Sequence, residues 1–171
     1  MKLKYLPHYT YEDYQKWQGD WELLEGIPYA MASPKLTNQI VLTKLVFILN
    51  TAINEKDCPC IPVVEVDWVI SENTVVRPDL SVICEGFDQD YIRRPPILVA
   101  EIVSESTKRM DEEIKFELYR EEGVKYYLLL YPENRSWKLY ENVSKRFLQK
   151  HGAELELKNC KINLDIERVW R

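Results

Sequence analysis

The chain has 171 residues, of which 46% are hydrophobic, and it carries a net charge of −5. This length suits one core and is short for two independent ones, so we expect a single domain over residues 1–171. The acidic balance argues against a constitutive, high-affinity nucleic-acid binder, because phosphate neutralisation by Lys and Arg supplies most of that affinity. It leaves room for an enzyme that contacts a nucleic acid briefly.

The first third of the sequence predicts two helices around a hairpin. Thr10 with Asp13 resembles a capping box, and Gly26 separates two strand-like runs. Apolar residues at three-to-four spacing then indicate a long core helix. The predicted elements are a helix at 11–18, strands at 21–25 and 27–32, and a helix at 37–54.

The remainder predicts a sheet with one helical crossover. A charged, proline-closed loop at 88–96 separates two of the apolar segments. A strand, helix, strand unit should set its two strands parallel through a right-handed crossover. The predicted elements are strands at 63–70, 75–84 and 97–103, a helix at 111–122, a strand at 125–131, an antiparallel pair at 136–141 and 145–151, and a last strand with a turn at 161–171. The fold class is therefore mixed α/β (α+β).

Neither a leader nor a membrane span is expected. No apolar region follows Lys2 and Lys4, and no run approaches the roughly 20 apolar residues that a span requires. A soluble, cytoplasmic protein is the resulting expectation. Its cysteines lack paired zinc-ligand spacing, so we expect them to be reduced, with no disulfide framework. They are Cys58, Cys60, Cys84 and Cys160.

Two acids interrupt apolar strands. Asp79 lies in the middle of the segment 75–84, and Glu101 is the one charged residue of the segment 97–103. An ionised carboxylate buried without a partner costs several kcal/mol or more, so each acid needs a cation, a proton or a metal nearby. A divalent cation between two such acids would turn their repulsion into coordination by hard oxygen ligands.

Simpler explanations of the two acids stay open from the residues alone. Arg77 lies two residues before Asp79, on the same strand face, and could pair with Asp79 or Glu101 in an ordinary salt bridge. One of the strands could instead be a sheet edge with its acid in water. That alternative suits Glu101 poorly, because both faces of its strand are apolar.

Other charged residues could assist a metal site. Asp111 and Lys115 lie four residues apart on one predicted helix face, so Lys115 could face the site. A lysine there can orient a water or offset transition-state charge. The plainer interpretation is a solvated ion pair between Asp111 and Lys115. Glu22 in the hairpin offers a third carboxylate, with Glu25 as its neighbour, and either could simply be exposed.

A series of short motifs resembles the Uma2 family of restriction-endonuclease-like proteins. Their order and spacing agree from about Tyr9 to the end of the chain. The motifs are Glu22-Leu23-Leu24-Glu25-Gly26, Met31-Ala32-Ser33-Pro34, Arg77-Pro78-Asp79-Leu80, Glu101-Ile102-Val103-Ser104 with Ser106-Thr107, Asp111 to Lys115, Tyr119 and Gly123-Val124. The resemblance implies the PD-(D/E)XK nuclease-like fold, a mixed sheet flanked by helices, with a metal site built from the acidic motif residues.

Carried over residue by residue, the resemblance implies a metal-ligand set. Asp79 becomes the PD aspartate and Glu101 the second metal ligand, with the backbone carbonyl of Ile102 assisting and Glu22 as a supplementary acid. Lys115 supplies the catalytic lysine.

The resemblance also marks three positions beside these ligands. Val103 occupies the usual position of the catalytic lysine, which is why Lys115 has to come from the following helix. Ser104 would hydrogen-bond the site or cap the next segment. Asn38 stands where the family usually has a histidine, and an amide cannot exchange protons near neutral pH.

The function expected from these residues is Mg²⁺- or Mn²⁺-dependent hydrolysis of DNA phosphodiester bonds by an endonuclease. Basic residues in loops could flank the cleft, and a homodimer would double those loops around a duplex. They are Arg93, Arg94, Lys108 and Arg109. The alternative is a nuclease-fold binding or regulatory module without turnover, for which tyrosine-rich segments could provide a partner surface, although strand packing explains those tyrosines better.

Overall fold

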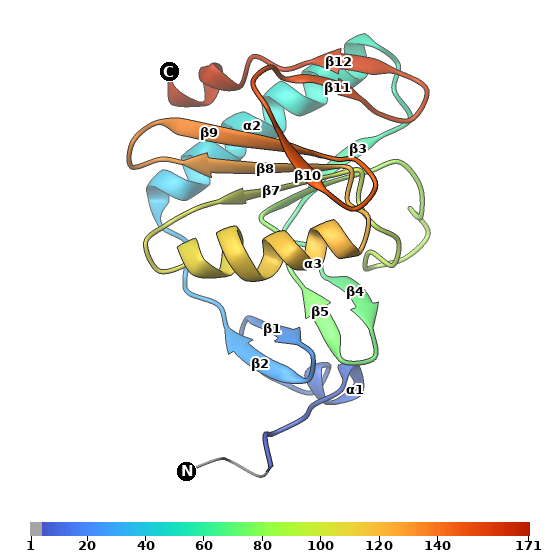
Figure 1. Cartoon of the computed structure of the whole chain (residues 1–171), viewed down its shortest axis with the longest axis vertical. Helices are drawn as coiled ribbons and strands as arrows, with labels where there is room; N and C mark the ends of the chain where they lie inside the picture. The colour runs from blue at the N-terminus through green and yellow to red at the C-terminus, as the bar shows by residue number, and fades with distance from the viewer. Residues whose placement is uncertain (1–4) are drawn as a thin grey trace.

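A six-stranded mixed sheet forms the centre of the computed structural model, which describes residues 5–171 (Figure 1). Lys2 and Lys4 lie outside this range. In spatial order its strands are β10 (Phe147–Lys150), β9 (Ser136–Asn142), β8 (Tyr126–Tyr131), β7 (Leu98–Ile102), β6 (Leu80–Ile83) and β3 (Ile61–Val64). The expected mixed α/β class is confirmed, as is the antiparallel pair formed by β9 and β10.

The crossover from β7 to β8 makes the one parallel pair of this sheet within the described residues. It runs through a π-helical turn, η1 (Met110–Ile114), which continues directly into α3 (Lys115–Glu121). The predicted parallel pairing is therefore confirmed. The single α-helix expected at 111–122 is instead a π-helix followed by an α-helix, and π-helical turns occur frequently at functional sites.

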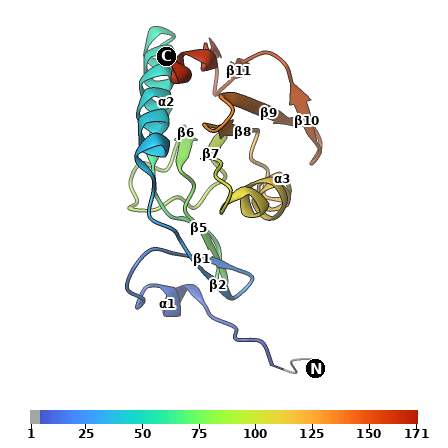
Figure 2. The same cartoon turned by 90° about the vertical axis from the view of Figure 1, so that its left-hand side faces the viewer.

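Two helices cover opposite faces of the sheet (Figure 2). The long helix α2 (Leu36–Glu55) packs on one face, against side chains such as Ala100 and Leu128. Helix α3 packs on the other face, with Val99 of β7 and with Val103, the residue after this strand. Since side chains alternate along a strand, Glu101 points to the α3 face. This places an acid within the layer that α3 closes.

The tyrosines of β8 belong to these two layers. Tyr126 and Tyr127 are almost fully buried, on opposite faces of the sheet. Packing therefore accounts for them better than a partner surface does.

Helix α2 is the one helix of the described chain that is long and apolar enough to cross a membrane by length and composition. This corrects the expectation that no segment approaches that size. A core helix passes the same test, and the inner face of α2 packs against the central sheet.

A smaller sheet lies below the central one in Figure 1. In spatial order it contains β2 (Ile27–Ala30), β1 (Trp21–Leu24), β5 (Thr74–Val76) and β4 (Trp68–Ser71). The N-terminal hairpin is thus confirmed as β1 and β2. Helix α1 (Tyr11–Tyr14) precedes it and is shorter than expected, although Thr10 and Asp13 do form the capping box.

The two long strands expected at 63–70 and 75–84 are each broken into two. Glu65 takes a positive φ of 53°, and Pro78 has no N–H to offer a ladder. The two halves of each predicted strand join different sheets. From the first strand, β3 enters the central sheet and β4 the small one; from the second, β5 enters the small sheet and β6 the central one. Asp79 consequently lies where the two sheets meet.

The expectation of reduced cysteines is wrong, because the structure contains two disulfides, Cys58–Cys160 and Cys60–Cys84. Cys60 and Cys84 flank the paired strands β3 and β6. Cys160 lies just before β12 (Lys161–Asn163), which pairs with β11 (Glu154–Glu156) and leads into the 3-10 helix η2 (Ile166–Trp170). Each cysteine of the Cys58-Pro59-Cys60 motif forms a disulfide with a distant segment, and local spacing does not reveal that pairing.

Reduction should lower the free energy of unfolding. Loop-closure entropy gives about 4.7 kcal/mol for a closed loop of roughly 100 residues and about 3 kcal/mol for one of roughly 15. The sequence separations here are 102 residues for Cys58–Cys160 and 24 for Cys60–Cys84. Urea unfolding with and without reductant should therefore show a loss of several kcal/mol, larger for Cys58→Ser/Cys160→Ser than for Cys60→Ser/Cys84→Ser. Identical transitions in both conditions would contradict this.

Candidate metal site

Asp79 and Glu101 are joined by two reciprocal hydrogen bonds between neighbouring chain segments. The backbone N–H of Asp79 donates to Oε2 of Glu101 at 3.1 Å, and the backbone N–H of Ile102 donates to Oδ2 of Asp79 at 2.7 Å. Each carboxylate is thus fixed by the backbone of the strand that carries the other. The structure brings together the two acids that the sequence singled out.

Lys115 reaches these acids from the first turn of α3. Its Nζ lies 2.8 Å from Oε1 of Glu22 and 3.0 Å from Oε1 of Glu101, and all three side chains are buried. The backbone N–H of Arg77 also donates to Oε1 of Glu22, at 2.8 Å. Glu22 is therefore part of the cluster, and its exposed alternative is wrong.

The solvated pair between Asp111 and Lys115 does not form. Both side chains are buried, and within residues 5–171 no ion pair joins them. Lys115 contacts the two buried glutamates instead.

Arg77 does not neutralise the site acids. Its guanidinium pairs with Asp67 at 2.7 Å and with Asp20 at 2.6 Å. The alternative in which Arg77 pairs with Asp79 or Glu101 is therefore wrong. The edge-strand alternative also fails for Glu101, which is 2% exposed on a strand with neighbours on both sides.

Two further residues belong to the cluster: Asp111, which the sequence indicated together with Lys115 as a helper of the site, and Tyr119, to which it assigned no role. Tyr119 is one turn beyond Lys115 on α3, and its hydroxyl donates to Oε1 of Glu101 at 2.8 Å. Asp111 on η1 is 3% exposed and lines the same cleft. The four-residue steps from Asp111 to Lys115 and on to Tyr119 could have indicated a shared helix face.

Burial dominates the ionisation of the cluster. It raises the pKa of Glu101 to about 8, although Lys115 opposes the shift, and it raises the pKa of Asp111 to about 8, with Glu101 adding to the effect. Burial also raises the pKa of Asp79. For Lys115, burial favours the neutral amine, but the carboxylates of Glu101 and Glu22 outweigh it and raise its pKa well above the usual value.

The donor set fits a hard divalent cation. Four carboxylates face one ammonium, and Oδ1 of Asp79 and Oε2 of Glu22 accept no hydrogen bond within residues 5–171. Oxygen ligands with an excess of negative charge are what Mg²⁺ or Mn²⁺ prefers. In the same range no three acid, His or Cys groups are arranged to hold a metal ion. Lys115 pairs with both Glu22 and Glu101.

The acids open into a cleft of about 440 Å³. One wall is the connection from β2 to α2 and the other is the connection from β7 to η1. Its lining includes positions that the motif series singled out, namely Glu22, Met31, Ala32, Ser33, Pro34, Asn38, Asp79, Glu101, Ile102, Ser104 and Lys115. Val103 is excluded from it and packs in the core beneath α3.

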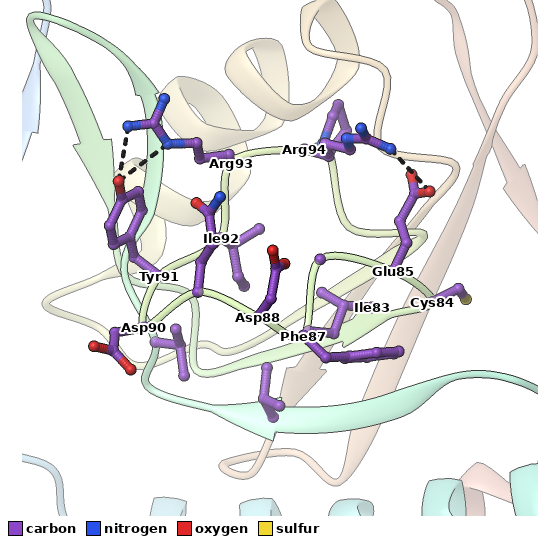
Figure 3. Close-up of a pocket in the computed structure, with 15 residues that line it drawn as sticks. Ile83, Cys84, Glu85, Phe87, Asp88, Asp90, Tyr91, Ile92, Arg93 and Arg94 are labelled. Carbon is purple, nitrogen blue, oxygen red and sulfur yellow. Dashed lines mark hydrogen bonds and ion pairs between the residues drawn. The ribbon is translucent and has the colours of Figure 1, made fainter.

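The loop arginines do not flank this cleft. Arg93 and Arg94 line a separate pocket of about 550 Å³ that shares no lining residue with the acids. Figure 3 shows Arg93 held by the Tyr91 hydroxyl and Arg94 paired with Glu85. Lys108 and Arg109 are exposed immediately before η1, and their neighbours Thr107 and Met110 do line the acid cleft. Of the four basic residues expected to flank the cleft, Lys108 and Arg109 alone lie beside its lining.

The fold has a known structural relative. A protein from Anabaena variabilis ATCC 29413, described as a putative nuclease belonging to DUF820, superimposes with a TM-score of 0.74 at 14% sequence identity. The alignment covers 94% of this chain and 97% of that one. This likeness shows a shared nuclease-type α+β fold. No curated protein sequence matches the chain.

The sequence profile of one family matches residues 11–166, which is nearly the whole described chain. That family carries the description "Putative restriction endonuclease". The matched range includes every member of the acid cluster, from Glu22 to Tyr119. The chain therefore belongs to the Uma2 family.

Proposed function

We propose that the chain is a divalent-metal-dependent endonuclease that hydrolyses DNA phosphodiester bonds. The observation that carries this proposal is the reciprocal hydrogen bonding between Asp79 and Glu101, with Lys115 at 3.0 Å from Glu101, at the bottom of an open cleft. The Uma2 membership and the described activity of the structural relative support the same class of reaction.

Asp79 and Glu101 would hold the cation, with the carbonyl of Ile102 and the carboxylate of Glu22 as supplementary oxygens. The free Oδ1 of Asp79 is available without breaking a hydrogen bond in the described structure. Bound there, Mg²⁺ or Mn²⁺ supplies Lewis-acid polarisation of the phosphate and of the attacking water. A cation would also favour the ionised forms of acids whose pKa values burial raises.

Lys115 would be the protein's own positive charge at the site, in addition to that of the cation. The two glutamates keep its ammonium protonated and hold Nζ at the cleft wall. From there it can orient the attacking water and offset charge on the pentavalent phosphoryl transition state. Its place next to Glu101, although Val103 occupies the usual lysine position, supports the assignment of the catalytic lysine to α3.

A second candidate function is a nuclease-fold binding module without turnover. It is favoured by the two ion pairs of Lys115, with Glu22 and with Glu101. In both pairs the ammonium competes with a cation for the carboxylate oxygens. Asn38, which lines the cleft, cannot transfer a proton. The two candidates differ in turnover, whereas both permit metal binding.

Metal binding should stabilise the fold through Asp79. At about 100 times its Kd, Mg²⁺ or Mn²⁺ should add roughly 2.7 kcal/mol to the free energy of unfolding, and Asp79→Asn should abolish this gain. Thermal or urea unfolding with and without the ion measures it. Asp88→Asn, which changes an exposed acid outside the cleft, is the matched control and should keep the full gain. An equal gain in the free energy of unfolding of Asp79→Asn would show that the cation binds elsewhere.

Cleavage should depend on Lys115. Removing one well-placed transition-state donor lowers turnover about 10²- to 10³-fold, so Lys115→Met should slow nicking of supercoiled plasmid by that factor. Lys108→Met removes a neighbouring exposed lysine and should change the rate little.

Circular dichroism of Lys115→Met must show a folded chain for this comparison, since the variant leaves buried acids unpaired. A persistent metal-induced stabilisation provides a second check of its fold. Nicking that is equal in the wild type, Lys115→Met and Glu101→Gln would come from a contaminant. Metal binding by a wild type that does not nick would favour the binding module.

A further inference from the structure

The outer face of α2 carries a regular stripe of exposed residues. Six exposed side chains follow one another along the helix at alternating steps of four and three residues. They are Leu36, Ile40, Thr43, Phe47, Asn50 and Asn54. We call this set the outer stripe. The five steps average 3.6 residues, the repeat of a straight α-helix, so the six positions lie along one face of α2.

The apolar part of the outer stripe is strongly exposed. Leu36 is 77% exposed, Ile40 46% and Phe47 62%. The inner face of the same helix is separately satisfied, because it packs into the core beneath the sheet. The fold of one chain therefore leaves these three side chains in water, where contiguous apolar residues mark an interaction surface.

The outer stripe also lacks charge, in a chain of which 30% of residues are charged. Lys44, the one ionisable residue between Leu36 and Asn54, lies at the margin of the stripe and donates to the backbone carbonyl of Arg171. Depletion of charged residues is typical of the central part of a protein interface. A second copy, which also carries −5, can approach this face without bringing acids together.

We propose that the outer stripe is a homodimer interface, in which α2 packs antiparallel against α2 of a second copy about a two-fold axis at Thr43. This register is self-complementary, as a two-fold interface must be. It places Ile40 of one copy against Phe47 of the other, twice, and Leu36 against Asn50. The antiparallel arrangement also aligns each helix dipole favourably with its neighbour.

The dimer would couple two acid clefts. Lys35, Asn38 and Gln39, at the start of α2, line the cleft wall. With a rise of about 1.5 Å per residue, the two Leu36 ends lie roughly 21 Å apart along the helix pair. The clefts would then be held at opposite ends of one rigid element. This inference does not depend on metal binding or cleavage, and it can stand if the proposed function fails.

The first test is the oligomeric state of intact protein. Light scattering coupled to size exclusion, over a series of concentrations, should give twice the chain mass for the wild type and the single mass for Phe47→Glu and Ile40→Glu. Leu148→Glu is the control, because it charges an exposed apolar residue on β10 and should remain dimeric. Circular dichroism confirms that each variant is folded.

The second test fixes the register. All four native cysteines are in disulfides, so one introduced cysteine supplies one free thiol per chain. Thr43→Cys on the axis should form a covalent dimer on mild oxidation, whereas Asn50→Cys, about 21 Å from its own mate, should not.

Three results would overturn the proposal. A wild type that is monomeric at every concentration would do so, as would a dimer insensitive to both glutamate variants. Binding of the monomer to lipid vesicles that is lost in Phe47→Glu would assign the face to a membrane surface instead. Equal cross-linking of Thr43→Cys and Asn50→Cys would reject the antiparallel register.

Discussion

The reciprocal hydrogen bonds between Asp79 and Glu101 constrain the rest of the site. Each acid accepts a hydrogen bond from a backbone N–H beside the other, so neither carboxylate can turn without losing that bond. A buried carboxylate is expensive unless its oxygens are satisfied, and this arrangement satisfies one oxygen of each acid with main chain that cannot leave. Lys115 and Tyr119 then share the remaining oxygen of Glu101.

That hydrogen-bonded pair explains why the strands around it are broken. Asp79 can direct its side chain toward Ile102 because β5 and β6 belong to different sheets, with Pro78 at the change of direction. An unbroken strand through Val75 and Leu80 would instead have carried Asp79 into a regular ladder. The small sheet also brings Glu22 on β1 to Lys115. The hairpin, the strand break and the first turn of α3 are thus separate elements that meet on the same few oxygen atoms.

The sequence predicted the parts of this arrangement that leave a local signal. Charges in apolar strands pointed to Asp79 and Glu101, and periodicity pointed to the helices and to the parallel crossover. The breaks at Glu65 and Pro78 were missed, because β-branched residues on both sides continue the strand pattern across them.

Burial and disulfide pairing were harder to predict. The burial of Asp111 and Lys115 depends on how α3 docks, which a single helix pattern does not contain. The disulfides were missed because each joins positions that only the finished fold brings together, over separations of 24 and 102 residues.

The ladder between β3 and β6 has unequal ends. At one end the Cys60–Cys84 disulfide closes it covalently, and at the other the N–H of Glu65 donates to the carbonyl of Asp79 at 3.2 Å. Strand β3 lies at the rim of the sheet with β6 as its sole partner there, within the described residues. It is therefore held covalently at the end far from the acids and by hydrogen bonds alone at the end beside them. A disulfide outlasts a hydrogen bond when a strand frays, so we expect local opening of β3 to start at the end beside the acid cleft.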